Sequence, residues 1–227
     1  MPPGETERRL ADAYFEHCDL LSPLIASKEA FLSMVEPLYR EHDAIQQTTL
    51  VTAKFRALLV FATAILLLNG TDSPVPVSRS EGYYSAAIHV PSQNPDMICT
   101  GDLDHVLNLL LAVQYSCFSA NLAAAAWHFI GLVTNLAIEL NLQNESVVGP
   151  QLAGVDTNER RWLFWATYIL EWNLCVITGG PFSISDEAVA IPLPVPPENN
   201  SLRTVALYFI KIRRPSPKST QYSHKKH

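Results

Sequence analysis

Closely spaced cysteines are missing from this 227-residue chain. A zinc knuckle or a redox motif needs cysteine pairs of the C-x2-C kind, so neither can be built locally here. The pattern favours reduced and mostly buried thiols in a cytosolic or nuclear protein. The four cysteines are Cys18, Cys99, Cys117 and Cys175.

Signals for membranes and secretion are also absent. The first fifteen residues, MPPGETERRLADAYF, contain no apolar segment of the kind that a secretory signal requires. The longest apolar stretch, Ala57–Leu68, has twelve residues, whereas a membrane span needs roughly 20. We therefore expect a buried core helix at this position and no membrane contact.

Charge is scarce and unevenly placed. Charged residues make up 17% of the chain and hydrophobic residues 48%, which predicts a folded domain rather than a disordered one. Arg203–His227 holds seven of the 16 basic residues and no acid, so residues 1–202 carry nine basic against 22 acidic side chains, a balance of −13. An acidic body repels DNA phosphate, and we expect no DNA reading by the folded part.

The basic end of the chain allows two interpretations. It either contacts phosphate or an import receptor, or it is a disordered and solvated tail, which is the interpretation that we favour. Pro215 ends the last helical pattern. The sequence therefore predicts a folded domain at residues 1–213 and a basic disordered tail at 214–227.

Helical periodicity dominates the rest of the chain. Proline and glycine separate the helical runs, and no segment alternates like a half-buried strand. The predicted fold class is all-α, a multi-helix bundle with an extended proline-rich arm near the C-terminus. The expected helices are Thr6–Cys18, Lys28–Glu41 with a break at Pro37, Thr48–Leu68, Ser78–Ile88, Asp102–Ser116, Asn121–Leu140, Asn158–Ile177 and Ser201–Arg213.

Local signals predict where several helices begin. Ser78 with Glu81 has the spacing of a capping box. Asp102 and Asp156 stand where a side-chain oxygen can accept a hydrogen bond from the first free backbone N–H groups. We expect each of these three sites to open a helix.

Other signals predict helix ends and loops. Asn69-Gly70 and Gly179-Gly180-Pro181 are typical of C-caps, and Pro91–Pro95 is typical of a loop. The prolines from 192 to 197 exclude both a helix and a central strand. We expect an extended arm there, with four apolar side chains packed on the bundle: Ile184, Val189, Ile191 and Leu193.

The run Asn121–Leu140 is apolar on nearly all sides. His128, Asn135 and Glu139 supply its few polar groups, and their spacing places them on one face. A helix that is apolar all round is normally buried. We therefore expect this helix in the middle of the bundle.

Two kinds of chemical site have weak support. A catalytic thiolate needs an adjacent imidazole, and Cys117 or Cys175 with His128 would have to supply it. Cys175 lies among apolar neighbours in NLCVITGG, where a thiol stays protonated, so structural cysteines and a protein that is not an enzyme are favoured. A metal site would have to be assembled across the fold, because no local spacing supports one.

Tryptophans concentrate on two neighbouring helices. They could line an aromatic pocket for a small effector, or they could be ordinary core side chains. We favour core packing and keep the effector pocket as the alternative. The residues are Trp127, Trp162, Trp165 and Trp172, with Phe129 and Phe164 nearby.

Two segments together resemble a known family. They are AAWHFIGLVTNLAIELNLQNE (Ala125–Glu145) and ERRWLFWATYILEWNLCVITGGPFSISDEAVAIPLPV (Glu159–Val195). Their order and spacing resemble the middle regulatory region of fungal zinc-cluster transcription factors, also called the xylanolytic-activator-type regulatory domain. The segment Leu10–Leu32 is similar to the opening of that domain, so the resemblance covers roughly residues 10–213.

The resemblance implies a nuclear, all-helical module that regulates transcription by RNA polymerase II through the transcription machinery or co-regulator proteins. In full-length relatives a six-cysteine zinc cluster reads DNA, but no segment here matches it, so no zinc ligand or DNA contact is assigned to this chain and no cofactor is expected. A small-molecule effector domain, and less so an all-α enzyme, are the alternatives. The positions that carry the family motif are Trp127, His128, Gly131, Arg160, Arg161, Leu163, Phe164, Trp165, Tyr168, Gly179, Pro181, Phe182, Asp186, Pro192 and Pro194.

Two positions depart from the family pattern. Relatives often have an acid followed by arginine where this chain has Glu171-Trp172, and they have G-R-P where it has Gly179-Gly180-Pro181. Two arginines are therefore missing near one carboxylate. We expect Glu171 to face solvent.

Overall fold

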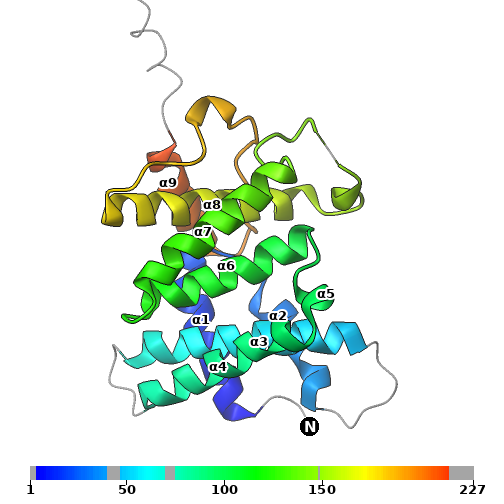
Figure 1. Cartoon of the computed structure of the whole chain (residues 1–227), viewed down its shortest axis with the longest axis vertical. Helices are drawn as coiled ribbons and strands as arrows, with labels where there is room; N and C mark the ends of the chain where they lie inside the picture. The colour runs from blue at the N-terminus through cyan, green and yellow to red at the C-terminus, as the bar shows by residue number, and fades with distance from the viewer. Residues whose placement is uncertain (1–3, 40–46, 70–74, 148, 215–227) are drawn as a thin grey trace, which may run out of the picture.

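Every regular element of the described residues is a helix, which confirms the all-α prediction. The computed structural model describes residues 4–39, 47–69, 75–147 and 149–214 (Figure 1). The expectations for Glu41, for Gly70 and for the tail from Pro215 lie outside these residues. The helices are α1 (Glu5–Leu21), α2 (Lys28–Val35), α3 (Gln47–Asn69), α4 (Val77–Gln93), α5 (Pro95–Ile98), α6 (Leu103–Phe118), α7 (Ala123–Glu139), α8 (Thr157–Thr178) and α9 (Ser201–Arg213), with short 3-10 turns η1 (Glu36–Tyr39), η2 (Pro150–Leu152) and η3 (Asp186–Ala188).

The helices are stacked in layers along the long axis of the molecule (Figure 1). α3 and α4 pack side by side at one end, α6 and α7 form the middle layer, and α8 lies with α9 at the other end. α1 crosses behind these layers and contacts both α3 and α9. It therefore connects the two ends of the stack.

α3 is the buried core helix that the sequence predicts. Among the described helices it alone is long and apolar enough to cross a membrane by composition, but 56% of its most apolar window is buried inside the molecule. α1, α4 and α6 all pack on it, and Leu59, Val60 and Ile65 are fully buried. These contacts explain its composition as core packing.

A chain of aromatic rings joins the first four helices. The ring centroids of Phe15 and Phe31 are 5.9 Å apart, those of Phe31 and Phe61 are 5.8 Å apart, and those of Phe61 and Tyr83 are 6.1 Å apart. These spacings are typical of edge-to-face contacts, which add to the free energy gained by burial. The aromatic core thus fixes α1, α2, α3 and α4 against one another.

A buried ion pair fastens α1 to α9. Arg203 Nη2 lies 3.4 Å from Asp19 Oδ1, and the same guanidinium donates to the backbone oxygen of Ile25 and lies over the ring of Trp162 at 5.2 Å. Asn200 Nδ2 also donates to Asp19 at 3.3 Å. Burial raises the pKa of Asp19, and Arg203 opposes this rise. Each of the two buried charges is therefore neutralised by the other.

Three predicted helix ends are confirmed. Asp102 Oδ1 accepts from the backbone N–H of His105 at 3.1 Å, and Asp156 Oδ1 accepts from Glu159 at 2.9 Å, so both aspartates are N-caps. Gly179 follows α8 with φ 71°, the left-handed conformation that glycine adopts at helix ends. The predicted break at Pro37 is also present, since α2 ends at Val35 and a 3-10 turn follows.

The predictions around α4 are wrong at both ends. The helix begins at Val77, one residue before Ser78, so Pro76 takes the N-cap position and no side chain caps it. At the other end the helix continues through Pro91 to Gln93, and α5 starts at Pro95 where a loop was expected. A proline in the last turn removes only one backbone hydrogen bond, and the bond from Asn94 N to Val90 O, at 2.9 Å, still closes the helix.

α7 lies in the middle of the stack, as expected, but it is not buried on all sides. This helix packs on α6 and α8, and in Figure 1 it lies in front of them. Leu132 is 55% exposed and Ile138 is 40% exposed. A helix that is buried on every side and a helix with one exposed apolar face can have the same average hydrophobicity. Composition alone therefore cannot tell the two cases apart.

We expect removal of one partner of the buried ion pair to destabilise the fold strongly. Asp19→Ala leaves the Arg203 guanidinium buried without its anion, which costs about 3–5 kcal/mol of unfolding free energy. Replacing both partners, as Asp19→Leu with Arg203→Met, removes the charge together with its need for a partner and is expected to recover most of that loss. Urea denaturation of the two variants measures both effects, and a double variant as unstable as Asp19→Ala would contradict this account.

Candidate functional site

The second family motif forms α8 and the segment that follows it. The Asp156 cap starts the helix and Gly179 ends it. Leu163, Phe164 and Trp165 are at most 1% exposed, and Tyr168 is also buried. The chain then turns back and runs as an extended arm over residues 181–195.

Hydrogen bonds from one side of α8 hold this arm. Near the end of the helix, the Cys175 thiol donates to the carbonyl of Pro181 at 3.2 Å. One turn earlier, Glu171 Oε1 accepts from the backbone N–H of Ser183 at 2.8 Å. Residue numbers increase along the arm, from 181 to 183, while those of their partners on α8 decrease, from 175 to 171. The arm therefore runs antiparallel to α8.

The same pattern continues toward the start of α8. Tyr168 Oη donates to Asp186 Oδ1 at 2.7 Å, and Trp165 Nε1 donates to the carbonyl of Pro192 at 2.9 Å. Burial, and then the Asp186 carboxylate, raise the pKa of Tyr168, which keeps its hydroxyl a donor. These two hydrogen bonds join four residues of the family motif.

The far end of the arm is fixed by an amide and by the chain after α7. Asn158 bonds Val195 twice, donating to its carbonyl at 2.9 Å and accepting from its N–H at 2.7 Å. Ala190 N donates to the carbonyl of Gln143 at 2.8 Å. Of the four apolar side chains expected to pack here, Ile184 and Ile191 are buried and Val189 and Leu193 pack against the core.

Glu171 does not face solvent, so that expectation is wrong. Its side chain is buried, and the residue is 4% exposed. The carboxylate turns inward because the arm brings the N–H of Ser183 to it. Sequence alone gives no signal for this contact, since the donor is a backbone group twelve residues away.

The first and second motifs meet where Trp127 covers Gly180. A Cβ atom built on Gly180 would lie 2.3 Å from the Trp127 ring, closer than atoms can approach. The ring therefore packs directly on the glycine backbone. The absence of a side chain at 180 is a steric requirement in this chain, which explains one of its departures from the family pattern.

The adjacent arginines of the motif have different environments. Arg161 Nη2 lies 2.7 and 2.9 Å from the two carboxylate oxygens of Glu145, and this pair links α8 to the chain after α7. Arg160 is buried, but its Nε and Nη2 have no hydrogen-bond partner among the described residues.

Several motif side chains make no hydrogen bond in this unit, and Pro181 and Pro192 take part in it only through their backbone carbonyls. His128 is exposed, as are Pro181, Phe182 and Pro192, whereas Pro194 is buried. A Cβ built on Gly131 meets nothing within 4 Å. His128 and Gly131 lie on α7, whereas the other four positions belong to the arm itself.

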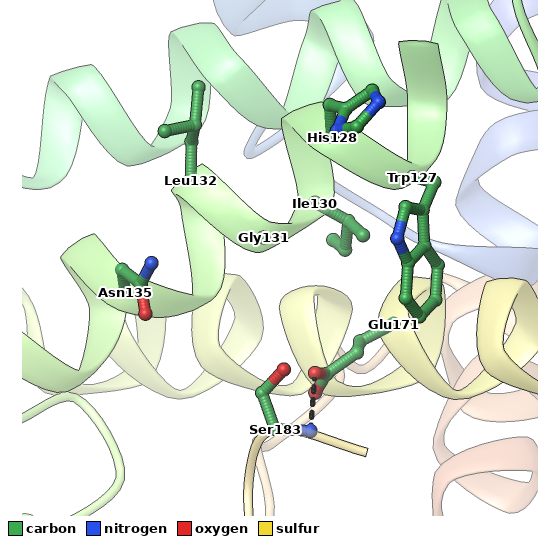
Figure 2. Close-up of a pocket in the computed structure, with 8 residues that line it drawn as sticks. All are labelled: Trp127, His128, Ile130, Gly131, Leu132, Asn135, Glu171 and Ser183. Carbon is green, nitrogen blue, oxygen red and sulfur yellow. Dashed lines mark hydrogen bonds between the residues drawn. The ribbon is translucent and has the colours of Figure 1, made fainter. Parts of the chain in front are cut away.

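A cavity of about 280 Å³ lies between α7 and the arm (Figure 2). In Figure 2 the Trp127 ring points toward α8, whereas His128 and Leu132 project from the opposite side of α7. Glu171 and Ser183 also line a second cavity of about 370 Å³, whose other walls come from α8, the arm and Arg213. The residues lining the first cavity are Trp127, His128, Ile130, Gly131, Leu132, Asn135, Glu171 and Ser183.

The alternative catalytic site lacks its chemistry. Desolvation by the surrounding protein raises the pKa of Cys117 to about 11, although this residue keeps some exposed surface. Desolvation also raises the pKa of Cys175, whose thiol donates to a carbonyl. Both thiols therefore stay protonated near neutral pH. The expectation of mostly buried thiols holds for Cys18 and Cys175, while Cys99 and Cys117 are exposed.

The cysteines also do not fit a zinc cluster. Over the described residues no three histidine, cysteine or acidic side chains gather in a way that could hold a metal ion. Burial raises the pKa of Cys18 far above its usual value, which opposes the thiolate that zinc needs. Zinc therefore has no ligand set in the described part of this chain.

A comparison with protein families identifies the domain. The model of the fungal specific transcription factor domain matches residues 12–224. The chain belongs to this family, which is a family of transcription factor domains and not of enzymes. The resemblance seen in the sequence is thereby confirmed.

Curated relatives are fungal regulators. The chain is 26% identical over 204 residues to the lactose regulatory protein of Kluyveromyces lactis, covering 90% of this chain and 21% of the relative. It is 24% identical over 194 residues to a negative regulator of pleiotropic drug resistance from Candida glabrata, covering 82% of this chain and 19% of the relative. It is 23% identical over 245 residues to the positive regulator of purine utilization of Emericella nidulans, covering 85% of this chain and 23% of the relative.

The chain thus spans about a fifth of the length of these relatives. No solved structure matches it at a significant level.

Gly180→Ala is expected to lower the unfolding free energy by about 1–3 kcal/mol, because the new methyl group overlaps the Trp127 ring and forces it to move. Gly131→Ala is the matched control: its Cβ meets nothing, it lies inside α7, and it should raise helix stability by up to about 1 kcal/mol. Thermal unfolding of the two variants gives the comparison. Equal shifts of the same sign would show that Trp127 does not pack on Gly180.

Proposed function

We propose that this chain is the regulatory domain of a fungal RNA polymerase II transcription factor. The observation that carries the proposal is the family match over residues 12–224, supported by the packing of its two sequence motifs into one docked unit. In this proposal the domain works in the nucleus and acts through co-regulator proteins or the transcription machinery.

DNA contact is assigned to a zinc-cluster segment that the present sequence does not contain. The balance of −13 over residues 1–202 supports this division, because an acidic surface is repelled by phosphate. The scattered cysteines support it as well, since the described residues offer no zinc ligand set.

Exposed apolar side chains near the end of α8 and on α9 support a protein-binding role. Ile177, in the last turn of α8, is 79% exposed, and Ile212 on α9 is 78% exposed, one turn after the exposed Tyr208. α8 and α9 pack against each other. Large apolar groups in water are a common property of protein interfaces.

A reporter assay tests this function. We expect the chain, fused to an unrelated DNA-binding domain and directed to the nucleus of a fungal host, to change reporter expression. The paired substitution Ile177→Asp and Ile212→Asp should remove most of that effect, because it places charge where an apolar partner surface would pack.

Ile88→Asp is the matched control, since Ile88 is also exposed but belongs to α4 at the other end of the molecule (Figure 1). It should leave the reporter signal unchanged. No change in expression from the wild-type fusion, at verified nuclear levels, would contradict the proposed function.

A further inference from the structure

The cavity beside Glu171 has the dimensions of a small-molecule site. Its volume of about 280 Å³ is close to the lower end of the range of ligand pockets, roughly 300–1,000 Å³. α7 forms one wall, and α8 with the arm forms the other (Figure 2). A ligand here would contact both family motifs at once.

Glu171 is a buried carboxylate that has no cationic partner among the described residues. Its Oε1 accepts one backbone hydrogen bond, and the side chain makes no ion pair with any described residue although the residue is 4% exposed. Taking a carboxylate out of water without a counter-charge is costly. The cation that lines the neighbouring cavity, Arg213, instead stacks its guanidinium over the Trp172 ring at 4.5 Å.

The other walls of the cavity suit an organic cation with an apolar body. The Trp127 ring points toward Glu171 (Figure 2), and aromatic faces attract ammonium groups. Asn135 and Ser183 add polar groups at the same space. An ammonium group carries three donors, and these two side chains together with Glu171 can offer three acceptors.

Other ligand classes fit less well. An anion would face the Glu171 charge, and a neutral ligand would leave that charge uncompensated. A metal ion would find one carboxylate where it needs several ligands, and over the described residues no metal-binding group of side chains is present. His128, the other titratable side chain of the lining, projects from the far side of α7 (Figure 2).

We propose that this cavity binds a small primary amine, with the ammonium group at Glu171 and the apolar body along Trp127 and Ile130. As an effector site it rests on the regulatory role proposed above, whereas amine binding itself depends only on the cavity. A negative reporter assay would therefore leave the binding measurement valid. A failure to bind amines would likewise leave the reporter result valid.

Three probes of one shape test the charge preference. Benzylamine is cationic at neutral pH, benzyl alcohol is neutral and benzoate is anionic. Calorimetry or NMR titration on the 227-residue chain should show that benzylamine binds with a Kd at least about tenfold lower than that of benzyl alcohol, a difference of about 1.4 kcal/mol. Benzoate should bind more weakly than both.

Two variants locate the site. Glu171→Gln should bring the Kd of benzylamine to that of benzyl alcohol, and Glu187→Gln, an exposed acid that lines only the second cavity, should leave it unchanged. Asn135→Leu lies on an exposed part of α7, so it serves as a second binding variant if Glu171→Gln unfolds, and it should weaken benzylamine binding.

Three results would overturn the proposal. The first is equal affinity, or no binding at about 10 mM, for all three probes, where even a weak site with a Kd of about 1 mM would be well occupied. The second is equal loss of benzylamine binding in Glu171→Gln and Glu187→Gln. The third is an arginine-containing tripeptide that binds at least tenfold more tightly than every small amine tested, which would assign the site to a partner protein.

Discussion

The docking of the arm on α8 is the interaction on which the site depends. Five residues on one side of the helix hold the arm by hydrogen bonds, from Cys175 at one end to Asn158 at the other. The arm has no helix or strand over its proline-rich part, so it cannot satisfy its own backbone groups. Asn158, Trp165 and Glu171 bond backbone groups of the arm from a rigid helix, and Tyr168 adds a bond to the Asp186 side chain. These contacts explain why the helix motif and the Pro-rich motif occur together.

The cavity is a consequence of this docking. Because the arm turns back at Gly179, it brings the N–H of Ser183 to Glu171 and the backbone of Gly180 under the Trp127 ring. α7 is thereby fixed against α8 at one point, and a space remains beside that contact. The residues that line this space come from α7, α8 and the arm, so a ligand bound there would contact all three elements.

The sequence predicts the parts of this structure that depend on neighbouring residues in the chain. Helix caps at Asp102 and Asp156 need only local backbone groups, and the inward face of α8 follows from its periodicity. The exposed outer face of α7, the burial of Glu171 and the contact of Trp127 with Gly180 depend on segments that meet only in the folded chain. The corresponding signals in the sequence are the apolar composition of α7, the arginine missing after Glu171 and the glycine at position 180. None of these signals specifies which segment the residue contacts.

Amide hydrogen exchange tests the docked arm most directly. The N–H groups of Ser183 and Val195 donate to Glu171 and Asn158, so both should be protected from exchange in the native chain. In Asn158→Ala the protection at Val195 should fall by at least about tenfold, which corresponds to about 1.4 kcal/mol of opening free energy, while α3 keeps its protection. Exchange at Ser183 and Val195 in the native chain as fast as in an unfolded peptide would contradict the account.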